Sequence, residues 1–143
     1  MLSDRDIIIY AAIGFSVWLN GALTFWLGGT ALFESGPLVS VLSAIGVAIA
    51  VCMVLRGTMA WRKAAPAQSV TVAVVMALPG LFGEAVRQLV FPWATGLQPM
   101  TQPAFAAAIF FGNGVLLAYA VWRAEVGPKF RSAAKAACEP QDA

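Results

Sequence analysis

Four long apolar runs dominate the sequence and constrain its fold more than any other feature. They cover residues 7–27, 37–55, 69–91 and 102–122. A helix needs about 20 apolar residues to cross a hydrocarbon layer of about 30 Å, and each run is close to that length. Because unpaired backbone groups are costly in lipid, such runs fold as helices. The sequence therefore predicts an all-α, polytopic membrane protein, a bundle of four transmembrane helices.

The composition supports a membrane protein rather than a soluble one. Of the 143 residues, 60% are hydrophobic and only 11% are charged, whereas about a quarter of the residues in soluble domains are charged. The polar residues are too few to cover a soluble domain of this size. We expect one membrane domain, residues 1–126, and a polar, flexible cytoplasmic tail, residues 127–143.

The basic residues lie on one side of the predicted membrane. Loops on the cytoplasmic side of a membrane are enriched in lysine and arginine. The two loops on the other side contain neither residue type. This asymmetry places both termini and the middle loop in the cytoplasm, and we expect a multi-pass protein of the bacterial inner membrane. The bases on the cytoplasmic side are Arg5, Arg56, Arg62, Lys63, Arg123, Lys129, Arg131 and Lys135.

The third apolar run contains an unusually polar stretch, "LPGLFGEAVRQL". Pro79 and Gly80 are expected to kink the helix, because proline removes a backbone donor and disturbs the preceding turn. Glu84, Arg87 and Gln88 share one helical face with Gly80. Charges inside a membrane are costly, and they often mark a functional site. Glu84 could form a structural ion pair with Arg87, or it could be protonated and take part in ligand binding.

The first run carries small and polar residues at every fourth position. These are Ala12, Ser16, Asn20, Thr24 and Gly28. Membrane helices associate closely through small residues and interhelical hydrogen bonds. We therefore expect this stripe to be the inward, packing face of the helix. Alternatively, Asn20 and Thr24 line a polar path.

Two further polar residues are candidates for the same site. Asn113 lies near the middle of the fourth run and should face the bundle, where it either holds helices together or contributes to a site. Glu34, in the first outer loop, could join the site or be a solvated loop acid. One hypothesis collects Glu34, Glu84, Arg87 and Gln88, with Asn20 and Thr24, in a pocket that opens outward.

Three short stretches, "FWLGG", "PGLFGEA" and "GVLLAYAV", give the chain a resemblance to a known family. It resembles an uncharacterised bacterial family of four-helix membrane proteins. The family's Pro-Gly pair and the acid four residues after the glycine correspond to Pro79, Gly80 and Glu84, and its late tyrosine corresponds to Tyr119. Where members carry a basic residue late in the first helix, this chain has Trp26. The resemblance implies a four-helix inner-membrane bundle and brings no known activity.

The sequence offers no arrangement of residues typical of an enzyme. It contains no histidine, and it shows no catalytic triad, metal-ligand cluster or phosphate-binding loop. We expect no catalytic residue, metal, cofactor or bound nucleic acid. The predicted function is that of a structural or accessory subunit in lipid, acting through helix contacts with itself or with another membrane protein. The alternative is a small proton- or cation-coupled transporter, or a ligand-binding protein, that uses Glu84.

Overall fold

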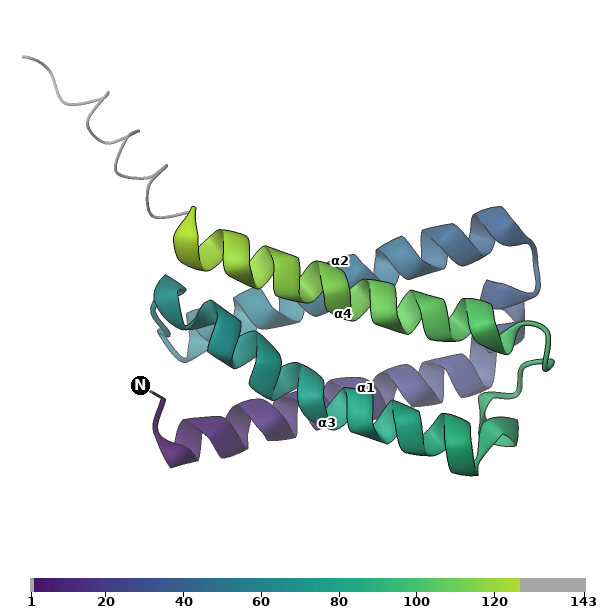
Figure 1. Cartoon of the computed structure of the whole chain (residues 1–143), viewed down its shortest axis with the longest axis horizontal. Coiled ribbons are helices and arrows are strands. Elements are labelled where there is room, and N and C mark those ends of the chain that lie inside the picture. Colours follow the sequence, from purple (N-terminus) through teal and green to yellow (C-terminus); the bar gives the residue numbers. More distant parts are fainter. Residues whose placement is uncertain (1, 127–143) are drawn as a thin grey trace, which may run out of the picture.

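The structure, a computed structural model, describes residues 2–126 as a bundle of four long helices (Figure 1). These residues contain no strand, and all four helices are long and apolar enough to cross a membrane. The predicted all-helical architecture with four membrane-spanning candidates is confirmed. The helices are α1 (Asp4–Phe33), α2 (Pro37–Trp61), α3 (Ser69–Val90) and α4 (Gln102–Glu125), with short 3₁₀ helices η1 (Pro66–Gln68) and η2 (Pro92–Thr95).

The helices extend beyond most of the predicted runs. At the start of α1 the Ser3 side chain accepts a hydrogen bond from the Asp6 backbone amide, which caps the helix and carries it through the charged first turn. At the other end α1 continues past two adjacent glycines to Phe33. Helix α2 includes Arg56 and ends at Trp61. The apolar runs therefore mark the parts of the helices suited to lipid, whereas the helices themselves include polar ends.

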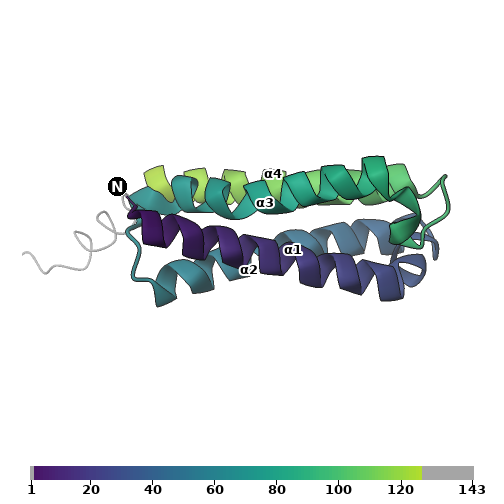
Figure 2. The ribbon, with the colours of Figure 1, turned by 90° about the horizontal axis from the view of Figure 1, so that it is seen from below.

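The four helices form two layers, α1 with α2 and α3 with α4 (Figure 2). Around the bundle, α1 packs mainly on α3 and α2 packs mainly on α4. Among neighbouring helices, α1 and α2 share the fewest contacts. The beginning of α1 and the end of α4 lie at the same end of the bundle (Figure 1). The residues after Glu125, including the predicted tail, lie almost entirely outside the described part of the chain.

A tight turn joins α1 to α2. Gly36 has a φ of 126°, a backbone conformation that residues with a Cβ rarely adopt. Pro37 follows as the first residue of α2, a position where its missing amide hydrogen is not needed. This Gly-Pro pair ends one helix and starts the next within three residues, Glu34, Ser35 and Gly36.

Helices α1 and α3 approach each other closely because Gly14 has no side chain. A Cβ placed on Gly14 would lie 1.9 Å from the backbone carbonyl oxygen of Met76. This contact brings the two backbones together near the middle of the bundle, in the manner of small-residue packing between membrane helices. It also fixes which side of α1 faces α3.

The predicted inward face of α1 is wrong as a packing face, although two of its residues, Asn20 and Thr24, border a cavity between the helices. Ala12, Ser16, Asn20 and Thr24 are all exposed on the isolated bundle, whereas α1 packs inward through Gly14, Phe25 and Gly29. The polar side chains need no neighbouring helix, because each donates to a carbonyl one turn earlier on α1. Ser16 donates to Ala12, Asn20 to Ser16 and Thr24 to Asn20, each at 2.8 Å.

Two groups of buried side chains form the core. The larger lies toward the end that holds both the start of α1 and the end of α4, and its buried members include Tyr10, Leu55, Met76 and Leu116. The smaller lies at the other end and is built around Phe25, Phe33 and Phe105, whose ring centroids lie 5.0 to 5.6 Å apart.

Candidate functional site

Glu84 is the centre of a buried polar cluster on α3. Only 6% of Glu84 and 8% of Arg87 is exposed. Arg87 donates to both carboxylate oxygens, from Nη2 to Oε1 at 2.5 Å and from Nε to Oε2 at 3.2 Å. Gln88 donates to Oε1 at 2.8 Å. The ion pair expected at this spacing is present, and Gln88 belongs to the same cluster.

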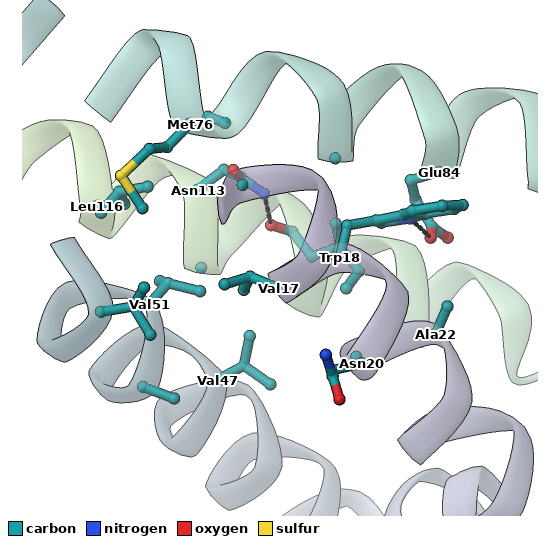
Figure 3. A pocket seen from close by; sticks show the side chains of 18 of the residues that line it. Val17, Trp18, Asn20, Ala22, Val47, Val51, Met76, Glu84, Asn113 and Leu116 are labelled. Atoms are coloured by element: carbon teal, nitrogen blue, oxygen red, sulfur yellow. Dashed lines mark hydrogen bonds between the residues drawn. The ribbon is translucent and has the colours of Figure 1, made fainter. Parts of the chain in front are cut away.

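A tryptophan from α1 completes this cluster. The Trp18 indole nitrogen donates to Oε2 of Glu84 at 3.4 Å (Figure 3). Its side chain lies over Gly80 and Gly83, where an added Cβ would come within 3.3 Å and 2.8 Å of Trp18 atoms respectively. The two glycines of the "PGLFGE" stretch therefore make room for the indole beside the carboxylate. Helix α3 runs through Pro79 without interruption, and the kink stays a prediction.

Arg87 is also held by an aromatic ring. Its guanidinium carbon lies 4.8 Å from the ring centroid of Phe105, a distance at which the ring face attracts a cation. Within the described residues, its Nη1 has no hydrogen-bond partner. The ion pair thus links α3 to α1 through Trp18 and to α4 through Phe105.

A cavity of about 330 Å³ lies between the helices and is lined by residues of all four. It is partly open to the outside, since its lining includes the exposed residues Asn20, Thr24 and Ala50. It is bordered by both core groups, since Met76 and Leu116 belong to the larger and Phe25 to the smaller. Most of the wall is apolar. The polar side chains that border it are those of Trp18, Asn20, Thr24, Glu84 and Asn113.

The amide groups of the two asparagines in the cavity wall donate within their own helices rather than to a neighbouring helix. Asn20 donates to the Ser16 carbonyl and Asn113 donates to the Ile109 carbonyl, both on their own helices. Figure 3 shows Asn20 beside the space that also borders Val47 of α2. In each case the bond is made by the amide nitrogen. The side-chain oxygen therefore remains able to accept a hydrogen bond from a molecule in the cavity.

Glu34 does not join the predicted pocket. Its carboxylate accepts hydrogen bonds from the backbone amide of Gln98 at 2.9 Å and from the hydroxyl of Thr101 at 3.1 Å. The side chain therefore ties the α1–α2 turn to the connector between α3 and α4. Of the residues that the pocket hypothesis grouped, Asn20, Thr24 and Glu84 border one cavity, and Arg87 and Gln88 contact Glu84. The hypothesis is corrected for Glu34, which forms a separate link between loops.

Sequence reasoning missed Trp18 and the cavity. Tryptophans in membrane proteins favour the interfaces, whereas Trp18 lies near the middle of an apolar run. A tryptophan in that position, and the two small residues Gly80 and Gly83 ahead of Glu84, are the signals from which the packing of α1 on α3 could have been predicted. Within residues 2–126, no three acidic or cysteine residues lie close enough together to hold a metal ion.

Fold and site define the class of this chain: a bundle of four helices, each long and apolar enough to cross a membrane, with a buried ion pair and a cavity between the helices. The chain belongs to a family described as "Family of unknown function (DUF5367)", whose model matches residues 31–125. The matched part includes Glu84 and Arg87 and leaves out Trp18. No curated protein and no solved structure is significantly similar to the chain.

Proposed function

We propose that this protein binds a lipid-soluble small molecule in the cavity between its four helices. The carrying observation is the cavity itself, about 330 Å³ in volume and walled mainly by apolar side chains with a few polar groups. Pockets for small ligands measure about 300 to 1,000 Å³ and have this kind of wall. The cavity is also partly open, so an apolar molecule from the surroundings can enter it.

The polar groups in the wall define the chemistry of the ligand. Asn20 and Asn113 each keep an acceptor oxygen, and Thr24 already donates its hydroxyl hydrogen to Asn20. A mainly apolar molecule matches this wall, with or without a hydrogen-bond donor for the asparagine oxygens. Such a molecule would lie against the apolar part of the wall.

In this proposal the Glu84–Arg87 pair has a structural role beside the cavity. Glu84 accepts hydrogen bonds from Arg87, Gln88 and Trp18, so its lone pairs are largely occupied. This arrangement supports the ion-pair alternative over an acid that carries protons or cations across the membrane. The pair holds Trp18 in place, and Trp18 in turn forms part of the cavity wall.

The accessory role expected from the sequence remains a prediction beside the proposed one. Contact with another membrane protein would use exposed apolar helix faces, such as the one that carries Leu27 and Leu23 of α1. Any helix that faces lipid has such a surface, so these residues do not favour a protein partner over lipid. The cavity therefore makes ligand binding the better supported alternative.

Orientation and location are part of the same proposal. Exposed basic residues, among them Arg56 and Lys63, lie at the end of the bundle where α1 begins. The bias of cytoplasmic loops toward lysine and arginine supports placing this end in the cytoplasm. For a bacterial protein the membrane would be the inner one, and the ligand would come from that bilayer.

Photolabelling tests the proposal directly. Purified protein in phosphatidylcholine vesicles is illuminated with iodophenyl trifluoromethyl diazirine, an uncharged lipid-soluble reagent, and labelled residues are located by mass spectrometry. We expect label at Met76 and Leu116, which line the cavity but are only 6% and 5% exposed. Label on these side chains therefore reports a reagent that has entered the cavity.

Two phenylalanine variants on α2 provide the control. Val51→Phe adds bulk to the cavity wall and should remove the label from Met76 and Leu116. Ile49→Phe introduces the same side chain at a position that is 56% exposed and should leave the label unchanged. Label confined to exposed positions such as Leu27 in the unchanged protein would overturn the proposed function.

A further inference from the structure

A groove on the outside of the bundle runs between α1 and α2. Its lining residues include Ile9, Ser16 and Asn20 of α1 and Val54 and Trp61 of α2. These are the two helices that share the fewest contacts among neighbours around the bundle. The groove is lined mainly by apolar side chains and faces the position that lipid would occupy around membrane-spanning helices.

The groove continues into the central cavity. Val17, Asn20 and Val54 line both of them. Two of the polar side chains that line the groove, Ser16 and Asn20, donate to carbonyls of their own helix rather than to α2. Hydrogen bonds between the two helices lie at their ends, where Arg62 pairs with Asp6 and Ser40 donates to the Phe33 carbonyl. A flexible apolar chain lying in the groove would meet the cavity wall at Val17.

The other end of the groove lies at the basic end of the bundle. Trp61 lines the groove there, and the Arg62 guanidinium carbon lies 5.7 Å from the Trp61 ring centroid. Arg62 also pairs with Asp6, whereas Lys63, two residues after Trp61, is exposed. The cationic groups of Arg62 and Lys63 at this end of an apolar groove fit a molecule with an apolar chain and an anionic head.

We propose that the groove and the cavity together bind one anionic phospholipid of the surrounding bilayer, which rests on the ligand-binding function proposed above. The headgroup lies at the basic end near Trp61, one acyl chain follows the groove between α1 and α2, and its tip enters the cavity. The lipid-soluble ligand is therefore a lipid chain that enters sideways from the membrane.

The dimensions agree with this placement. From Ile9 to Asn20, α1 rises by about 16 Å at about 1.5 Å per residue. One leaflet of a bilayer contributes about half of the 30 Å hydrocarbon layer, or about 15 Å. An acyl chain anchored by its headgroup near the start of the groove would therefore reach the Asn20 region, where groove and cavity meet.

A tethered photolabel tests the sideways route. The protein is reconstituted in phosphatidylcholine vesicles that contain phosphatidylglycerol with a diazirine near the end of one acyl chain. Because the headgroup stays at the membrane surface, the diazirine reaches buried Met76 and Leu116 only through an opening in the side of the bundle. We expect label at both residues, and less of it when the same diazirine chain is carried by phosphatidylcholine.

Matched tryptophan variants identify the route. Ser16 lines the groove but not the cavity, so Ser16→Trp should lower the tethered label at Met76 and Leu116 to background. Leu19→Trp, at a position that is 53% exposed, should have no effect. Lys63→Gln should lower the preference for phosphatidylglycerol, whereas Arg56→Gln, on the face of α2 opposite Val54 and Trp61, should leave it unchanged. Label at exposed Leu27 and an unchanged circular dichroism spectrum show that each variant is folded.

The outcomes separate this inference from the function on which it rests. If the free diazirine labels Met76 but the tethered lipid labels only exposed residues, the lipid route is overturned and the cavity still binds small molecules. Equal labelling by both tethered lipids would overturn the anionic headgroup. If neither reagent labels Met76 or Leu116, the proposed function fails as well.

Discussion

Glu84 and Arg87 are charged residues in a part of the chain that is otherwise suited to lipid. Removing two charges from water is costly, and their mutual attraction offsets that cost only when geometry and further hydrogen bonds are good. Here Arg87 binds both carboxylate oxygens, Gln88 and Trp18 add two more donors, and Phe105 lies against the guanidinium. The pair is therefore stable as a unit, and each partner depends on the other.

Breaking the pair from one side should destabilise the protein strongly. Arg87→Met leaves the Glu84 carboxylate buried without its main partner, and we expect the free energy of unfolding to fall by about 3 to 5 kcal/mol. Glu84→Gln combined with Arg87→Met removes both charges and should restore most of that loss. The measurement is unfolding by sodium dodecyl sulfate in mixed micelles, followed by circular dichroism. Arg56→Met, at an exposed base, serves as the control.

The comparison of the single and double variants decides the role of the pair. A double variant as unstable as Arg87→Met alone would show that the individual hydrogen bonds, rather than the balanced charges, hold α3 in place. That result would contradict the account of Glu84 and Arg87 as one unit.

At the level of helices, the α1–α3 contact depends on a missing side chain. Gly14→Ala would place a Cβ 1.9 Å from the Met76 carbonyl oxygen, so the two helices must separate. Overpacking of this kind costs about 1 to 3 kcal/mol. Gly21→Ala on the same helix meets no atom within 4 Å and should be neutral or stabilising by up to about 1 kcal/mol, since alanine favours helix more than glycine does.

The same unfolding assay measures both glycine variants. Equal effects of Gly14→Ala and Gly21→Ala on the free energy of unfolding would mean that α1 does not pack on α3 through Gly14. The relative placement of the two helices would then need revision.

Glu34 connects the α1–α2 turn to the segment between α3 and α4. We expect its removal to affect only these loops. Glu34→Ala removes the acceptor for the Gln98 amide and the Thr101 hydroxyl. We expect faster hydrogen exchange at the Gln98 amide and a loss of about 0.5 to 1.5 kcal/mol in stability, the usual range for a hydrogen bond. Ser35→Ala is the neighbouring control. Unchanged exchange at Gln98 would show that Glu34 is a solvated acid.

The helices could be predicted from the sequence because each is encoded in its own stretch of apolar residues. Their ends could not, since the cap at Ser3 and the continued helix through Gly29 depend on local hydrogen bonds rather than on apolarity. The Glu84–Arg87 pair was accessible because both residues lie on one helix three positions apart. The face of α1 was misassigned because Ser16 and Asn20 satisfy their donors within α1, and a polar stripe then needs no inward partner.

For the whole molecule, the cavity is formed by the arrangement of the four helices. The cavity depends on the contacts of four helices at once, and neither the spacing of residues nor the composition of any single run contains that information. The bundle places the start of α1 and the end of α4 at one end (Figure 1), in agreement with an even number of crossings. Which end faces the cytoplasm remains a prediction from the basic residues.

Cysteine labelling tests the orientation. In a background without native cysteines, Lys63→Cys and Ser35→Cys place single thiols in exposed positions at opposite ends of the bundle. Since cytoplasmic loops carry the lysines and arginines, we expect a membrane-impermeant maleimide added to intact cells to label the cysteine at position 35 and not that at position 63. After the membrane is opened, both should react. The reverse pattern in intact cells would invert the assigned topology.

The central claim is that the cavity holds a ligand, and a crystal structure of the protein grown in a lipidic mesophase tests it most directly. We expect continuous elongated density that begins beside Trp61, passes between α1 and α2 and ends between Met76 and Leu116. The contradicting result is a bundle in which Val51, Met76 and Leu116 have moved together and filled the space, with α1 packed tightly against α2.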